Sequence, residues 1–140
     1  MSVNVGQRNI PDTPQTKQCY AVDACMEFAL HTQKICKNHK IFTDDYKELR
    51  DKIIDTAINI YIASYDANKI KAISQSEKEK RLKLQIAAIN SCISMMGFIN
   101  LAKRSFHLRS GKSEYWVKKL IYAREMLKKW HDADLKRYGM

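Results

Sequence analysis

The chain has 140 residues, the usual size of a single domain and enough to bury one hydrophobic core. Only two prolines and four glycines interrupt it, which is too few turn residues for a sheet-rich fold. Its 25 Lys and Arg against 15 Asp and Glu give a formal charge of +10, which favours an acidic partner, and nucleic acid before a membrane surface.

The first predicted elements are a tail and a helix. Residues 1–13 are polar and show no apolar period, so we expect a disordered or loosely attached tail. Thr13 and Pro14 suit an N-cap and the first position of a helix, which we predict over residues 14–38. Its expected apolar stripe is Tyr20, Val22, Met26, Ala29 and Cys36.

A second helix is predicted over residues 44–71. Thr43 offers a capping oxygen, and Asp44 and Asp45 place negative charge where a helix N-terminus favours it. The apolar residues recur at steps of three and four, so they share one face. They are Tyr46, Leu49, Ile53, Ala57, Ile60, Ala63, Ala67 and Ile70.

A third helix is predicted over residues 77–105, because Ser76 and Glu79 have the spacing of a capping box. Its predicted inner face is Leu82, Ile86, Ile89, Ile93 and Met96. Further apolar residues lie on its flanks, namely Leu84, Met95, Phe98 and Leu101. A second apolar surface suggests self-association through the first and third helices, so we predict an oligomer interface at Met95, Phe98 and Leu101.

The last predicted helix covers residues 114–137, with Ser113 as its N-cap. Its stripe is Trp116, Leu120, Ala123, Leu127 and Trp130. Four long helices joined by short loops predict an all-α fold, with residues 14–140 packed as an antiparallel up-down-up-down four-helix bundle.

Positive charge concentrates near the C-terminus. Between Ile99 and Met140, eleven basic side chains face four acidic ones. Such a density suits binding to phosphates with release of condensed counterions. The predicted nucleic-acid-binding residues are Lys103, Arg104, Arg109 and Lys112, extended along the last helix by Lys118 and Lys119.

Catalytic motifs are few. The sequence has no Glu-x-x-His segment of a di-metal bundle and no glycine-rich phosphate loop, so we expect neither an enzyme nor a cofactor. One spacing is an exception, because Arg124 and His131 lie seven residues apart on one helical face. It resembles the motif of HEPN ribonucleases, in which the histidine acts on the RNA ribose and the arginine steadies the phosphate. The alternative function is therefore a HEPN-like ribonuclease or toxin module.

The expected location is the cytoplasm, because the N-terminus lacks the apolar core of a signal peptide and no run of about 18 apolar residues predicts a membrane span. The four cysteines would then be reduced. Without a C-x-x-C pair, their spacing does not predict a zinc site, and we expect small buried side chains.

From Cys25 onward the residue order resembles a family of four-helix bundles. The family includes Avd, the accessory variability determinant of diversity-generating retroelements, and the proteins encoded in 23S ribosomal-RNA intervening sequences. The resemblance rests on Ile35-Cys36-Lys37-Asn38, Ala67-Asn68, Arg81 with Gln85, Tyr115-Trp116, and the closing segment from Leu127 to Tyr138.

This resemblance implies a non-catalytic accessory protein. It would form a homopentamer that binds the reverse transcriptase of the retroelement and its template RNA or cDNA, and so take part in mutagenic retrohoming. The residues alone predict a basic, self-associating helical bundle.

Overall fold

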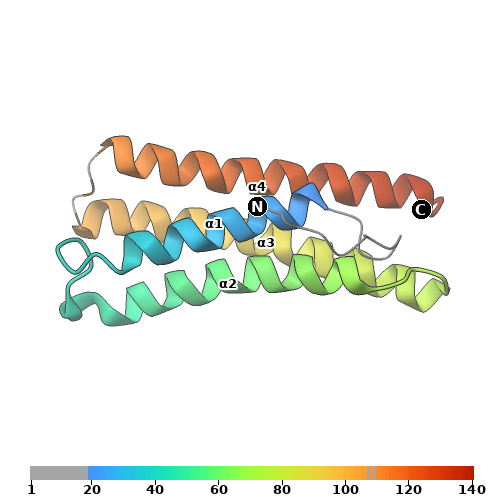
Figure 1. The fold of residues 1–140 in the computed structure, drawn as a ribbon, viewed down its shortest axis with the longest axis horizontal. Helices are drawn as coiled ribbons and strands as arrows, with labels where there is room; N and C mark the ends of the chain where they lie inside the picture. The colour runs from blue at the N-terminus through green and yellow to red at the C-terminus, as the bar shows by residue number, and fades with distance from the viewer. Residues whose placement is uncertain (1–18, 107, 109) are drawn as a thin grey trace, which may run out of the picture.

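The computed structural model describes residues 19–106, 108 and 110–140, and in these residues it is all-helical, without strands. The elements are α1 (Tyr20–Cys36), the 3-10 helix η1 (Asp44–Tyr46), α2 (Lys47–Lys69), α3 (Gln75–Phe106) and α4 (Ser110–Arg137) (Figure 1). The predicted all-α class is confirmed. The predicted tail and the start of a helix at Thr13 and Pro14 lie outside the described residues.

The four long helices lie side by side along their length (Figure 1). α1 packs against α2 and α4, and α3 packs against the same two helices. At one end of the molecule α1 and α3 finish and α4 begins, and we call it the basic end. At the other, which we call the Asp134 end, α2 and α4 finish and α3 begins.

The core contains the predicted stripe of α4, since Trp116, Leu120, Ala123 and Leu127 are buried and Trp130 is partly buried against it. A polar contact joins α1 to α4 within this core. The indole Nε1 of Trp116 donates to Oγ1 of Thr32 at 2.9 Å, and that hydroxyl donates to the carbonyl oxygen of Phe28 at 2.8 Å. Because both side chains are fully buried, the contact fixes which turn of α1 faces which turn of α4.

The predicted stripes of α1 and α2 are only partly correct. In α2, Ile53, Ala57, Ile60 and Ala67 are buried as predicted, whereas the buried Ser64 was not predicted. Tyr46, in η1, is exposed. In α1 the prediction was wrong for Tyr20 and Met26, which are 66% and 40% exposed. The core face of α1 instead includes Cys25, Phe28, Thr32 and Ile35. Cys25 and Thr32 are therefore buried, although a hydrophobic pattern by itself does not predict core positions for a small thiol and a hydroxyl.

The predicted inner face of α3 was correct for Leu82 and Ile89 but wrong for Ile86 and Ile93, so the true face is rotated about the helix axis. Ile86 and Ile93 are 40% and 61% exposed, whereas Met95, predicted at an oligomer interface, is fully buried. Phe98 packs partly buried against the core, and Leu101 alone of the three predicted interface residues is well exposed. The buried residues of α3 are Leu82, Gln85, Ala88, Ile89, Cys92, Met95, Ile99 and Ala102. Because α3 is apolar almost all round, its hydrophobic pattern does not determine which face is inside.

α3 also bears on the expected absence of a membrane-spanning segment. Its most apolar window of 18 residues has a mean hydropathy of 1.4, so by length and composition this described helix is apolar enough to cross a membrane. In the described structure 28% of that window is buried, and eight residues of α3 as a whole are buried.

Three predicted helix caps differ from those observed. Thr43 makes no side-chain cap and precedes a 3-10 turn, so α2 begins only at Lys47. Ser113 is buried within α4 rather than preceding it. The capping box lies two residues earlier than predicted, because Oγ of Ser74 accepts from the backbone N–H of Glu77 at 3.2 Å while the carboxylate of Glu77 accepts from the N–H of Ser74 at 2.9 Å.

Candidate nucleic-acid interface

Three of the predicted cations meet at the basic end. Lys103 and Arg104 are exposed in the last turn of α3, and Lys112 is exposed in the first turn of α4. Within the described part of the chain, none of the three forms an ion pair. Arg109, the fourth predicted member, lies outside the described residues. We call Lys103, Arg104 and Lys112 the basic cluster.

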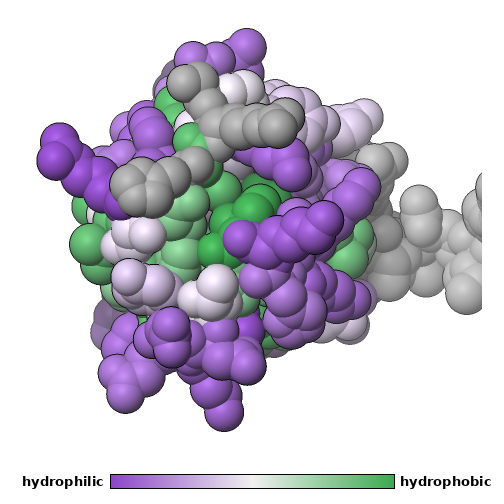
Figure 2. All heavy atoms as spheres, turned by 90° about the vertical axis from the view of Figure 1, so that its left-hand side faces the viewer, coloured by the Kyte–Doolittle hydropathy of each residue, from purple (hydrophilic) through white to green (hydrophobic). Residues whose placement is uncertain are grey.

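An aromatic cluster supports this end of the bundle. Phe42, in the connection after α1, is fully buried, and its ring centroid lies 4.3 Å from that of Phe106 at the end of α3. Tyr46 contacts the same ring edge-on at 4.8 Å. Figure 2 looks onto this end and shows hydrophobic surface in the middle of a hydrophilic rim. The cations thus project from a packed base rather than from an isolated helix end.

Lys118 and Lys119 have different surroundings from the basic cluster. Both line a hollow of about 480 Å³ between α1 and α4, together with the carboxylates of Asp23 and Glu27. Nζ of Lys119 lies 5.0 Å from the ring centroid of Tyr115. Because the two carboxylates offset their charge, these lysines are less suited to phosphates than the basic cluster.

Sequence reasoning missed the contribution of α1 to this surface. His31 and Lys34 line a second hollow of about 340 Å³ with Lys112 and Tyr115. The ring of His31 meets Tyr115 edge-on, with centroids 5.0 Å apart. Burial, followed by the nearby charges of Lys119 and Lys34, lowers the pKa of His31. No pattern in the sequence places α1 beside the first turn of α4, so these residues could be found only from the fold.

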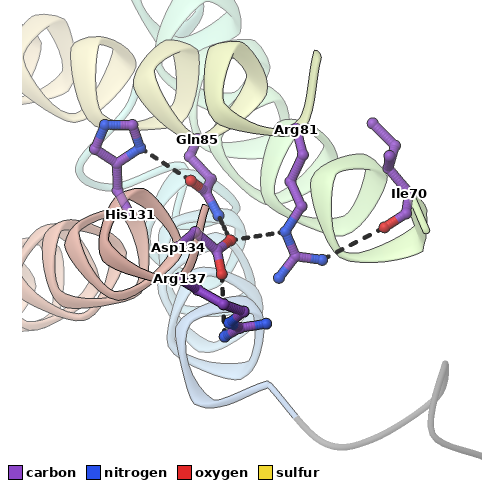
Figure 3. Close-up of polar contacts among 6 residues, drawn as sticks. All are labelled: Ile70, Arg81, Gln85, His131, Asp134 and Arg137. Carbon is purple, nitrogen blue, oxygen red and sulfur yellow. Dashed lines mark hydrogen bonds and ion pairs between the residues drawn. The ribbon is translucent and has the colours of Figure 1, made fainter. Parts of the chain in front are cut away.

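A buried ion network occupies the Asp134 end (Figure 3). Asp134 is fully buried, and its Oδ2 accepts hydrogen bonds from Nε of Arg81 and Nε2 of Gln85, both at 2.7 Å. Its Oδ1 lies 3.1 Å from Nη2 of Arg137, an ion pair without the alignment of a hydrogen bond. Arg81 also donates to the carbonyl oxygen of Ile70 at 3.5 Å. The network therefore connects α4 to α3 and to the end of α2.

His131 belongs to this network and does not contact Arg124 within the described residues. Nε2 of Gln85 donates to Asp134, so its Oε1 faces Nδ1 of His131 at 2.9 Å and must accept a hydrogen bond from Nδ1–H. The hydrogen bonds thus assign a proton to Nδ1 of His131. Arg124 pairs instead with Glu125 at 3.5 Å.

Three of the four cysteines are buried in the core, and Cys19 is partly buried. Burial raises the pKa of Cys25, Cys36 and Cys92 to about 12 in each case, which keeps these thiols protonated and unreactive at neutral pH. In the part of the chain described by the structure, no group of three or more His, Cys, Asp or Glu residues is placed to hold a metal ion.

Comparison of the chain with protein-family models, with curated protein sequences and with solved structures finds no match in any of the three.

Proposed function

We propose that residues 14–140 form an antiparallel up-down-up-down four-helix bundle that binds nucleic acid at its basic end and catalyses no reaction. The helix pairings, with connections at alternating ends in Figure 1, support this topology. The observation that carries the binding proposal is the basic cluster. Lys103, Arg104 and Lys112 come from two helices, are exposed, and have no carboxylate partner in the described residues.

The resemblance to the Avd family supports a more specific role. The chain would bind a reverse transcriptase and its template RNA or cDNA in a diversity-generating retroelement, acting in the cytoplasm. Several residues that carry the resemblance, among them Arg81, Gln85 and Asp134, belong to one buried network. A shared network gives these scattered positions a common structural reason to occur together.

Self-association is part of the proposal, with a homopentamer as the state that the resemblance favours. The exposed apolar residues of α3 support it, although the set differs from the predicted one. Ile86, Ile93 and Leu101 are each at least 40% exposed and recur at steps of seven and eight, so they form a stripe along one face. A second copy would remove this stripe from water.

The alternative is a HEPN-like ribonuclease using Arg124 and His131. The observation that favours it is the hydrogen bond between Nδ1 of His131 and Oε1 of Gln85, because it leaves Nε2 as the nitrogen that could act as a base in the neutral ring. The pairing of Arg124 with Glu125 argues against it, because a phosphate would have to displace that carboxylate.

The test measures binding of a labelled single-stranded RNA by fluorescence anisotropy across a salt series. If about four phosphates are neutralised, log affinity should fall against log salt with a slope of roughly −3. Combining Lys103→Glu with Arg104→Glu should weaken binding and flatten this slope. A matched variant combining Lys52→Glu with Lys83→Glu makes the same change in net charge at exposed positions elsewhere and should bind like the wild type.

Equal weakening in both double variants would contradict a localised interface. The same RNA, incubated with the wild type and then analysed for length, separates the two proposed functions. We expect it to remain intact. Cleavage that disappears in a His131→Ala variant would establish the ribonuclease instead.

A further inference from the structure

A hollow of about 800 Å³ lies at the Asp134 end, where the start of α1, the end of α2 and the end of α4 come together beside Arg81 of α3. Its volume falls within the range of roughly 300 to 1,000 Å³ that is common for small-molecule sites. It is separate from the basic cluster, which lies at the opposite end of the helices.

The charged residues that line this hollow are all positive. Five basic residues line it, and no carboxylate does so among the described residues. The five are Lys69, Lys71, Arg81, Lys129 and Arg137. The nearest acidic group in the network is Asp134, fully buried and in contact with Arg81 and Arg137. One buried carboxylate thus offsets part of the charge of five cations, which leaves an excess of positive charge toward the opening.

Aromatic rings complete the lining. Tyr20 is 66% exposed, while Trp130 and Tyr138 are half-buried. The guanidinium of Arg81 lies 5.1 Å from the ring centroid of Trp130 and is also held by Asp134. Arg81 and Trp130 are therefore fixed before any ligand arrives, which lowers the entropic cost of binding.

We propose that this hollow binds a nucleotide. Lys71, Lys129 and Arg137 would bind the phosphates, because they line the hollow and their side chains are exposed at its rim. The base would pack against the exposed ring of Tyr20, since aromatic rings stack on any nucleobase. This site is additional to the proposed nucleic-acid interface and does not depend on it.

Two sources present this chemistry: a free nucleoside triphosphate, and the 5′-triphosphate end of an RNA strand. Both have a nucleobase joined to a chain of phosphates. They differ in that an RNA chain would have to extend out of the hollow into solvent, whereas a free nucleotide would not. Competition experiments distinguish the two ligands.

The experiment titrates the full-length protein with ATP by isothermal titration calorimetry. The test variant combines Lys71→Glu with Lys129→Glu, two exposed positions outside the Asp134 network, so folding should be retained. The control combines Lys103→Glu with Arg104→Glu, which makes the same change in net charge at the other end. We expect the test variant to lose more than about tenfold in ATP affinity and the control to remain within about twofold of the wild type.

Absence of ATP binding by the wild type, or equal losses in both variants, would overturn the proposal. Pyrophosphate binding as tightly as ATP would also overturn it, because the base would then contribute nothing. Competition by 5′-triphosphorylated RNA, but not by the 5′-hydroxyl RNA of the same sequence, would support the proposal and assign the strand end as ligand. Competition by neither would support the free nucleotide. RNA binding lost only in the control variant would show that the two sites are independent.

Discussion

At the Asp134 end, Arg81 and Arg137 are held by a carboxylate that no water reaches, whereas Lys103, Arg104 and Lys112 at the basic end stand exposed without an ion pair in the described residues. Both ends are rich in Lys and Arg, so composition does not separate them. The burial of the cations and their ion pairs distinguish the two ends. Arg81 is committed to joining helices, and the basic cluster remains available to bind a partner.

The two arrangements also differ in how mutation should act on them. A buried ion pair contributes little net stability compared with a well-packed apolar group, yet removing one partner leaves the other charge uncompensated. Exposed cations are screened by water and salt, so their loss hardly affects folding. Stability should therefore depend on the Asp134 end and nucleic-acid binding on the basic end.

The largest expected effect is that of Asp134→Asn. The amide keeps the shape of the side chain but leaves Arg81, whose side chain is 12% exposed, without its anion. We expect the free energy of unfolding to fall by about 3 to 5 kcal/mol, measured by urea denaturation with far-UV circular dichroism. Asp132→Asn, two residues earlier and exposed, is the matched control and should stay within about 0.5 kcal/mol of the wild type. Equal changes in the two variants would remove the distinction between the ends.

A smaller effect is expected from the double reversal of Lys103 and Arg104 to Glu. Both residues lie in the last turn of α3, where a positive charge interacts favourably with the helix dipole. Their reversal should lower the free energy of unfolding by about 1 kcal/mol or less. The same denaturation experiment measures this change, and a loss as large as that of Asp134→Asn would mean that the basic cluster is structural.

The smallest effect concerns His31, beside the basic end. Its pKa is lowered in the folded state by burial and by Lys119 and Lys34, so below about pH 6.5 the unfolded chain takes up a proton that the folded chain resists. Stability should therefore fall as the pH falls through that value. The melting temperature of the wild type should drop more between about pH 7.5 and about pH 5.5 than that of His31→Gln. Above that window the two should change in parallel, and parallel behaviour throughout would contradict the prediction.

The sequence predicted helices more reliably than faces. α4 has one clear apolar stripe, and its buried residues from Trp116 to Leu127 were all expected. α3 offers apolar residues on every side, so Ile93 was placed inside and Met95 outside, the reverse of what is found. Only packing against α2 and α4 determines the inner face of α3. Gln85 and Ala88 are buried there, whereas the larger Ile86 and Ile93 are exposed to water.

The candidate sites were predictable only in part. A local excess of Lys and Arg indicated the cations of the basic end, because charge density is visible along the chain. The network at Asp134 was not predicted, since Arg81 and Gln85 are 53 and 49 residues away from it. From the sequence alone, Asp134 is indistinguishable from a solvated aspartate such as Asp132, until the fold brings its partners together.

The hydrogen bond between Trp116 and Thr32 joins residues 84 positions apart, so α1 is synthesised long before its partner in α4. Until α4 emerges, the side of α1 that carries Phe28 and Ile35 has only the neighbours that α2 supplies. Closure of α1 against α4 should therefore be a late step in folding. On a polysome, neighbouring nascent chains each expose an α1 whose Thr32 hydroxyl is still without its indole donor. When α4 emerges from one chain, it could therefore pack against α1 of the other copy and make the same contact, which is a domain swap.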